Sequence, residues 1–558
     1  MIIGCALLLN LAAHAAVITW TNIAGGNWSV GANWSPNSVP GANDIAIITN
    51  NGTYSVTLDF SPAVAGVTLG GGAGTQTLFM NGQTLTLNGP MTVNSNGSYT
   101  LDSGGLVGNS NAVLTGTFNW TAGSPGGVLT LTAGSTWNIT SANDHNLPNC
   151  TFTNYGTVGW GSGRICGGGS GSLIYNYGLW NVQGDWAFTD DYGGNGAAIY
   201  NYGTFRKSAG ANTSQTLLQN GVVFNQLGGM VDVQTGNLAL QGGGNLDGGF
   251  FTTNQTGATV LSAGSFNING AVTSTNTVEN GGNLAANSII RGGMTWLGGS
   301  CFNSVTIASN GVVLLAGGGN MYLYNCSVTN YGTFAWNSGY PDGGGTPGTL
   351  IYNYGLWDCQ SDYSFKDDGG GNNIAFNNYG TLRKSAGANG SQTLLPYSVS
   401  LNQLGGMVDV QTGNLALQGG GNFDGGFVTT NASGSLVLSA GSFNFNGAVT
   451  STNTVENGGN LVSNNVIIGA VTWAGGTWNG SSVTIASNSL VLLAGGGGTM
   501  YLYNCSVTNY GTFAWNSGYP DGGGTTPGTF VYNYGLWDCQ GDGSFKDDGG
   551  GNDTAFNN

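Results

Sequence analysis

The stretch Cys150-Thr-Phe-Thr-Asn-Tyr-Gly-Thr-Val-Gly-Trp160 contains the tripeptide that decides the fold, Asn154-Tyr155-Gly156. The same tripeptide, always followed by Thr or Leu, returns at seven further sites, and neighbouring copies within a group are 22–25 residues apart. Alternating β-branched and aromatic residues flank each copy, as is typical of short strands. Strand, turn and strand repeated at this period predict a solenoid with one coil per repeat.

We therefore expect an all-β chain folded as a right-handed parallel β-helix. Asn and Gly tolerate the positive φ that a sharp turn needs. Stacked Asn side chains can also hydrogen-bond from coil to coil, as amide ladders do in cross-β stacks. A common loop tripeptide is the alternative, but eight copies in matching surroundings disfavour it. The predicted structural ladder consists of Asn154, Asn176, Asn201, Asn330, Asn353, Asn378, Asn509 and Asn533.

The composition limits both the fold and the partners. Of 558 residues, 105 are Gly, yet apolar residues at 40% and aromatic residues at 11% argue against disorder. Only 6% are charged, and the net charge of −16 includes just eight Lys and Arg. A nucleic-acid binder needs clustered cations to neutralise phosphates, so nucleic acid is not an expected partner. Cations, Ca²⁺ above all, are the charged partners that this balance favours.

A longer repeat overlies the short one. Met321–Thr346 and Met500–Thr525 are identical, as are Asn225–Asn245 and Asn402–Asn422. A solenoid can lengthen by such copying because each coil contacts only its neighbours. We expect five segments, which are a signal peptide (1–16), an N-terminal cap with the first coils (17–117), and three solenoid blocks (118–293, 294–470 and a truncated 471–558).

Both ends of the chain carry an expectation. The apolar residues 1–16 finish in Ala13-His14-Ala15, which is typical of a secretory signal with its cleavage site. No other stretch is long and apolar enough to span a membrane. The third block stops at Asn558, inside the repeated motif. This predicts a fragment of a longer protein whose last coil is uncapped and able to associate end to end.

The opening segment adds a family resemblance. Trp20, Trp28 and Trp34 belong to the pattern W…GNWS…NWS…VPG-x-x-D-x-A-x-I. Together with the units NQLGGMVDVQTGNLALQGGG and NYGTFRKSAGAN, it resembles large secreted bacterial β-helical repeat proteins, of the autotransporter-passenger-like and PEP-CTERM-type surface classes. The resemblance implies a secreted or cell-surface, adhesin-like or structural protein. On physical grounds, the tryptophans would cover the open end of the strand stack.

Cysteine and histidine offer little chemistry. Seven cysteines follow the leader without a CxxC metal spacing, and Cys326 and Cys359 differ in phase within the coil. We expect buried free thiols that behave as small hydrophobes. His145 is the one histidine outside the leader, and we expect a surface or turn residue because Ser-His-Asp chemistry needs a positioned base.

Paired carboxylates recur at one place in each block. They could bind Ca²⁺ in a Gly-rich turn, or they could form a solvated turn. Adjacent carboxylates point to opposite sides of a strand, whereas a glycosidase needs two that face one substrate. The candidate metal ligands are Asp190, Asp191, Asp367, Asp368, Asp547 and Asp548.

Basic and aromatic residues recur as well. Arg206-Lys207 and Arg383-Lys384 each follow a tripeptide copy, and one residue of each pair must face outward. We expect these pairs to form surface ion pairs with acidic turns of the preceding coil, or to protect a strand edge. Exposed tryptophans could stack on glycans, but apolar neighbours favour buried stacks instead. The tryptophans concerned are Trp180, Trp336, Trp357, Trp515 and Trp537.

The sequence thus predicts a structural or adhesive solenoid, secreted or held at the cell surface, without enzymatic activity and without a cofactor other than Ca²⁺. Surface glycans or other cell-surface proteins are the expected partners. The alternative is a carbohydrate-binding or carbohydrate-active β-helix protein, similar to a polysaccharide lyase or a glycoside hydrolase.

Overall fold

A computed structural model describes residues 15–558, apart from 109–110, 254–255, 270–272, 286, 369, 371–373, 389, 431–432, 447–449, 549–550 and 552. The predicted signal peptide lies almost wholly outside the described residues. Regular structure in the described part is β-strand, with one short 3-10 helix, η1 (Gly31–Asn33). None of the helices described here is long and apolar enough to cross a membrane.

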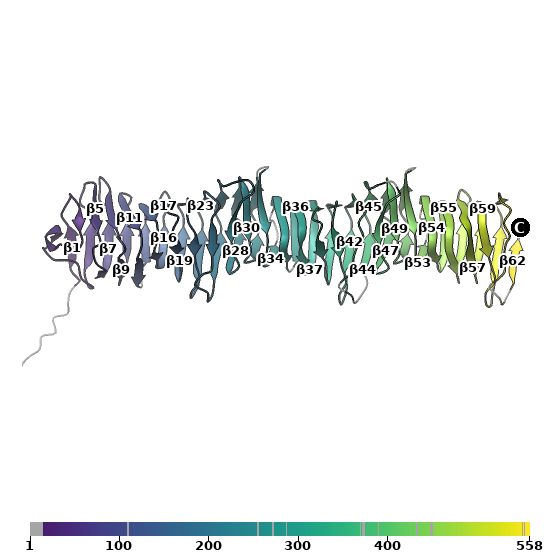
Figure 1. The fold of residues 1–558 in the computed structure, drawn as a ribbon, viewed down its shortest axis with the longest axis horizontal. Helices are drawn as coiled ribbons and strands as arrows, with labels where there is room; N and C mark the ends of the chain where they lie inside the picture. The colour runs from purple at the N-terminus through teal and green to yellow at the C-terminus, as the bar shows by residue number, and fades with distance from the viewer. Residues whose placement is uncertain are drawn as a thin grey trace, which may run out of the picture. The chain divides into compact units, whose positions relative to one another are not determined.

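The chain divides into two compact units, Met1–Ser265 and Phe266–Asn558. Within each unit, parallel strands stack as the coils of a β-solenoid (Figure 1), so the predicted fold class is confirmed.

One coil of the first unit contains three strands, β19 (Cys150–Asn154), β20 (Thr157–Trp160) and β21 (Ile165–Cys166). Each pairs in parallel with the strand three places further along the chain. These partners are β22 (Ser172–Asn176), β23 (Leu179–Val182) and β24 (Ala187–Thr189). The next coil continues with β25 (Ala197–Asn201), β26 (Thr204–Lys207) and β27 (Gln215–Leu218).

Side chains alternate between the interior and the surface along these strands. In β19 the buried positions are Cys150, Phe152 and Asn154, and the register places Phe152 against Ile174 of the next coil. Every second residue therefore extends an apolar column through the coil stack. Burying one such large side chain contributes about 1.5–3 kcal/mol, and the contribution recurs in each coil.

The glycine of the tripeptide has a different role from the predicted one. Positive φ is found at many glycines, but Gly178 and Gly355 of the motif are not among them. A Cβ on Gly178 would lie 2.2 Å from the carbonyl oxygen of Gly156 in the preceding coil, and one on Gly355 2.2 Å from that of Gly332. Glycine is required because consecutive turns approach too closely for a side chain.

The first strands close the N-terminal side of the first unit. β1 (Val17–Trp20) pairs antiparallel with β3 (Trp34–Ser35) and parallel with β4 (Ile45–Ile48). Trp20, Trp28 and Trp34 are almost fully buried, and their rings meet edge to face. The three tryptophans form a small aromatic core beneath this strand pair.

The second unit mixes two kinds of coil. Short strands surround its tripeptide copies, in β39 (Cys326–Asn330), β40 (Thr333–Trp336), β42 (Leu350–Asn353), β43 (Leu356–Cys359), β44 (Ile374–Asn378) and β45 (Thr381–Lys384). Long strands with register shifts form the other kind, in β35 (Thr273–Leu284), β36 (Asn287–Cys301), β37 (Asn303–Leu315), β54 (Thr450–Leu461), β55 (Asn464–Asn479) and β57 (Leu490–Tyr503).

Candidate functional site

The tripeptide asparagines form hydrogen-bonded ladders inside the coils. In the first unit, Asn154 Nδ2 donates to Asn176 Oδ1 at 2.7 Å, and Asn176 Nδ2 donates to Asn201 Oδ1 at 2.7 Å. Gln226 ends this ladder by accepting from Asn201. Each amide also donates to a backbone carbonyl of the next coil, as Asn154 does to Leu179. All of these side chains are fully buried, so the asparagine amides satisfy one another where water is absent. The Nε2 group of Gln226, at the end of the ladder, has no hydrogen-bond partner among the described residues.

The second unit repeats the arrangement. Asn330, Asn353 and Asn378 are linked at 2.8 Å per step, and Gln403 accepts from Asn378. Asn509 donates to Asn533 in the same way. The predicted neighbours in the ladder are therefore brought together in each of the three groups.

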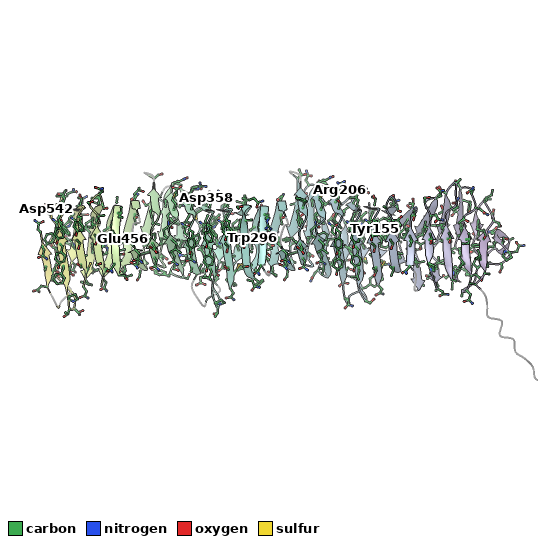
Figure 2. The ribbon with its side chains drawn as sticks, turned by 180° about the vertical axis from the view of Figure 1, so that it is seen from behind. Tyr155, Arg206, Trp296, Asp358, Glu456 and Asp542 are labelled. Atoms are coloured by element: carbon green, nitrogen blue, oxygen red, sulfur yellow. A yellow bond between two sulfur atoms is a disulfide. The ribbon has the colours of Figure 1, made fainter. Side chains whose placement is uncertain are left out.

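The tyrosine of the tripeptide points outward, and the sequence interpretation overlooked it. Tyr155, Tyr177 and Tyr202 stack with ring centroids 5.0 and 4.7 Å apart and planes within 14° and 8° of parallel. Figure 2 labels Tyr155. Each ring remains 41–50% exposed. The second unit carries an equivalent stack. We call these stacks the tyrosine ladders, comprising Tyr155, Tyr177 and Tyr202 in the first unit and Tyr331, Tyr354 and Tyr379 in the second.

The two predicted basic pairs do contact acidic residues, but not as surface pairs throughout. Lys207 is completely buried, and its Nζ donates to Asp185 Oδ1 at 2.7 Å, to two backbone carbonyls and to Thr216 Oγ1. Lys384 makes the same contacts with Asp362 and Thr393. The surface expectation is wrong for both lysines, because each ammonium is enclosed by one carbonyl group of the turn that follows it and by a carbonyl group and a carboxylate of the preceding coil.

These lysines control the charge of their partners. Burial would raise the pKa of Asp185 and of Asp362, but the ammonium group and a backbone N–H outweigh it, so both pKa values fall below the ordinary value. Each Asp therefore remains ionised beside its lysine at neutral pH.

The two arginines are partly exposed and form their ion pairs in opposite directions along the coil stack. Arg206, labelled in Figure 2, reaches Asp232 of the following coil, with Nε 2.8 Å from Oδ2. Arg383 instead makes two hydrogen bonds to Asp358 of the preceding coil. The position equivalent to Asp358 in the first unit is Asn181, which offers no charge.

The candidate calcium ligands do not converge on a metal centre. In each pair the second carboxylate lies beside a cation of the chain, with Asp191 2.9 Å from Arg164 Nη1 and Asp368 3.9 Å from Lys366 Nζ. The first carboxylate folds back over a glycine turn, so that a Cβ on Gly168 would meet Asp190 Oδ1 at 2.1 Å. Asp367 lies over Gly344 likewise, and Asp547 and Asp548 occupy the third block with Lys546. Among the described residues, no three His, Cys, Asp or Glu side chains are grouped to hold a metal ion.

A polar network lies beside the second of these Asp pairs. Asp342 is fully buried, and its Oδ2 accepts from Asn320 Nδ2 at 2.8 Å and from the Tyr324 hydroxyl at 3.2 Å. Its Oδ1 accepts from the backbone N–H of Asp368. Burial raises the pKa of Asp342, and the charge of Asp368 adds to the rise. Lys366 Nζ lies 3.3 Å from Asn320 Oδ1.

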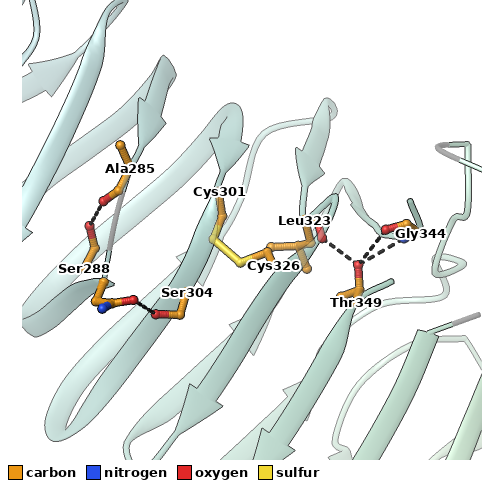
Figure 3. Close-up of a disulfide and its surroundings, with 9 residues drawn as sticks. Ala285, Ser288, Cys301, Ser304, Leu323, Cys326, Gly344 and Thr349 are labelled. Atoms are coloured by element: carbon orange, nitrogen blue, oxygen red, sulfur yellow. Dashed lines mark hydrogen bonds between the residues drawn. A yellow bond between two sulfur atoms is a disulfide. The ribbon is translucent and has the colours of Figure 1, made fainter. Parts of the chain in front are cut away.

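A disulfide joins Cys301 and Cys326, which are 25 residues apart. The expectation of free thiols throughout is therefore wrong. Cys301 ends β36, and Cys326 begins β39, which pairs with β37 at Asn303, so one coil step brings the two cysteines together (Figure 3). Cys150, Cys166, Cys359 and Cys505 are buried and free, as predicted, whereas Cys539 is free and exposed.

The disulfide borders a cavity of about 180 Å³. Ser300 and Cys301 at the end of β36 line it, together with Phe302, Tyr322 of β38 (Asn320–Tyr322) and Tyr324. Phe302 and Tyr322 are 47% and 37% exposed. Exposed aromatic rings around a hollow, with a polar network at its edge, are the features expected of a small-molecule site.

Two glutamates lie fully buried in the long-strand coils. Burial raises the pKa of Glu279 well above its ordinary value, and neither of its carboxyl oxygens has a hydrogen-bond partner among the described residues. Burial does the same to Glu456, although Trp478 Nε1 donates to its Oε2 at 2.9 Å. Both carboxyls are therefore stabilised in their protonated form.

His145 is buried, so the surface expectation is wrong. Its ring meets Trp120 edge to face at 4.9 Å, and Nε2 lies 3.2 Å from the Trp120 carbonyl oxygen. Burial lowers its pKa. The tryptophans follow the buried interpretation, since Trp180, Trp336 and Trp357 are at most 2% exposed. Trp515 is also buried, and Trp537 is half-buried.

No protein-family model matches the chain, and no curated protein matches it.

Proposed function

We propose that this protein is a structural and adhesive solenoid, secreted or held at a cell surface, that contacts its partner through repeated outward-facing edges. The observation that carries the proposal is the pair of tyrosine ladders, in which each ring is 41–51% exposed although it stacks on its neighbours. Contiguous exposed aromatic surface is uncommon on soluble proteins and marks interaction sites.

The polar groups around the ladders support a role without catalysis. The tripeptide amides bond to one another, and the lysines are engaged by several acceptors at once. Asp342 has a raised pKa, but it is fully buried and therefore cannot touch a substrate. These groups maintain the coil geometry that holds the tyrosines in line.

An adhesion assay tests the proposal. Beads coated with the full chain are applied to surfaces coated with neutral polysaccharides, acidic polysaccharides or cell-envelope protein. We expect attachment to at least one surface, reduced several-fold when Tyr331, Tyr354 and Tyr379 are all replaced by Ser. Tyr397→Ser is the matched control, because Tyr397 is 70% exposed outside the ladders. Circular dichroism verifies that each variant is folded.

Two results would contradict the proposal. One is equal attachment by the ladder variant and the control variant. The other is release of new sugar chain ends from a polysaccharide, lost in Asp367→Asn, which would favour the carbohydrate-active alternative.

A further inference from the structure

The residues that line the cavity beside the disulfide are only partly repeated in the third block. Residues 321–346 of the second block are identical to 500–525 of the third, so Tyr322, Tyr324 and Asp342 have counterparts in Tyr501, Tyr503 and Asp521. The strand that pairs with these residues differs in sequence between the two blocks. Ser300 pairs with Tyr322 in the second block, and Thr477 pairs with Tyr501 in the third. This register aligns Cys301 with Trp478 and Phe302 with Asn479.

The difference changes the shape of the site. Trp478 is fully buried, stacks on Trp473 at 4.1 Å and donates to Glu456, so an indole takes the place of the disulfide. Asn479 removes the exposed ring that Phe302 provides. The third block therefore keeps the two tyrosines but lacks the aromatic wall opposite them.

In the second block, three aromatic rings surround the hollow. Phe302 and Tyr322 expose much of their surface, and the ring centroids of Tyr322 and Tyr324 lie 5.5 Å apart with planes 52° from parallel. Tilted rings around a shallow space present both faces and edges to a ligand. The C–H face of a sugar ring is apolar enough to lie on such a surface while its hydroxyl groups remain free to hydrogen-bond.

Polar groups stand at the same edge and are held in place. The Tyr324 hydroxyl donates to buried Asp342, which leaves its oxygen free to accept, and Ser300 is one of the residues that line the hollow. Burial and the charge of Asp342 raise the pKa of Tyr324 to about 12, so the phenol keeps its proton at neutral pH. Lys366 Nζ lies 4.0 Å from the centroid of the Tyr340 ring, close to Asn320.

The volume and the charge restrict the ligand. A cavity of about 180 Å³ is smaller than the roughly 300–1,000 Å³ typical of sites for drug-sized molecules, so it suits one ring. The net charge of −16, with Asp342 and Asp368 nearby, disfavours an anionic ligand. An aromatic hollow with neutral hydroxyl groups instead favours an uncharged polyol ring.

We propose that the hollow formed by Ser300, Cys301, Phe302, Tyr322 and Tyr324 binds one neutral pyranose unit of an oligosaccharide or polysaccharide. This rests on the proposed adhesive function and identifies the ligand class for one of its contact points. Phe302 and Tyr322 hold the ring by stacking, Tyr324 and Ser300 bond its hydroxyl groups, and the disulfide fixes the two coils that carry these residues.

Isothermal titration of the full chain tests this site. The probes are the hexamers of β-linked glucose, mannose and xylose, with a galacturonic acid hexamer as the acidic comparison. We expect at least one neutral hexamer to bind, and Phe302→Ala and Tyr322→Ala each to weaken it roughly tenfold, the change that corresponds to about 1.4 kcal/mol. Tyr501→Ala, in the identical tyrosine setting of the third block, should leave the affinity within about twofold.

The inference is overturned if no neutral hexamer binds, if only the acidic hexamer binds, or if Tyr501→Ala weakens binding as much as Tyr322→Ala does. Unfolding midpoints establish that the variants remain folded. Failure here is distinguishable from failure of the adhesive function. If the ladder variant loses attachment while Phe302→Ala keeps it, the function stands and this site does not.

Discussion

The tripeptide coils and the long-strand coils both bury a polar side chain in the interior. In the tripeptide coils this side chain is an amide, and in the long-strand coils it is a carboxyl group. In β42 the residue is Asn353, which accepts from Asn330 and donates to Asn378. In β54 it is Glu456, which accepts from Trp478 and retains one oxygen with no partner among the described residues.

The difference lies in self-complementarity. An amide carries both donors and an acceptor, so the same residue can be repeated coil after coil with every group satisfied. A carboxyl group offers a donor only while it is protonated, and two ionised carboxylates in successive coils would repel each other. The buried glutamates therefore occur singly, in coils where the strands are long and the register shifts.

The largest expected effect on stability comes from replacing a ladder asparagine with a carboxylic acid, the group that the long-strand coils bury. Asn353→Asp removes the donors to Asn378 Oδ1 and to the Thr381 carbonyl and introduces a buried acid. We expect a loss of about 3–5 kcal/mol in the free energy of unfolding at pH 7. Urea unfolding followed by tryptophan fluorescence measures it.

Asn337→Asp is the matched control, because Asn337 is exposed on the coil that begins with Asn330. Its unfolding midpoint should stay close to that of the parent chain. If both variants lose the same stability, the hydrogen-bonded ladder does not hold the coils together in the way described.

The buried lysine gives a smaller effect. Lys384→Met keeps the apolar stem but removes the ammonium that Asp362 and Thr393 contact. Because Asp362 is partly exposed, water can replace some of the lost contact, and we expect a loss of about 2 kcal/mol. Thermal unfolding of Lys384→Met beside Lys366→Met, whose lysine is one-third exposed, measures the difference.

The same pair predicts a pH dependence. The folded pKa of Asp362 is depressed, so its contribution to stability is present above the unfolded pKa of about 3.9 and is lost as the pH falls through the folded value. In this acidic range, the free energy of unfolding of the parent chain should fall to that of Lys384→Met. An advantage that stays constant down to pH 2 would contradict the assigned ion pair.

Much of the fold followed from the period of one tripeptide, because the strand alternation around Asn330 fixes which residues point inward. The role of Gly355 could not be predicted from this period, because the approach of one turn to the next depends on coil spacing and not on local turn preference. The outward tyrosines were predictable in principle. If Asn330 points inward, Tyr331 directly after it begins the turn on the outside.

The buried histidine could have been predicted only by comparing the blocks, and the disulfide and the cavity lie where the repeat gives little guidance. His145 aligns with Met321 and Met500, which are buried, and this alignment contains the signal for a buried histidine. Cys301 and Cys326 are separated by 25 residues, within the range of one coil step, but Cys301 has no tripeptide copy beside it to reveal its phase. The cavity depends on Phe302, which no repeat marks.

The smallest expected effect concerns the long-strand coils themselves. Glu456→Gln keeps the shape of the side chain and the acceptor for Trp478 but removes the group that must stay protonated.

Folding raises the pKa of Glu456, so the stability that its protonated form provides is complete below the unfolded pKa of about 4.3. It is lost as the pH rises through the higher folded value. The parent and the variant should therefore unfold at similar urea concentrations at pH 4, and the variant should unfold at a higher urea concentration than the parent at pH 7. Glu279→Gln should behave alike, because the two residues occupy equivalent positions, whereas the exposed Asp247→Asn should show no such divergence. If the parent chain gains stability over Glu456→Gln between pH 4 and pH 7, the carboxyl is ionised in the folded state, and the contrast between amide and carboxylate coils fails at this residue.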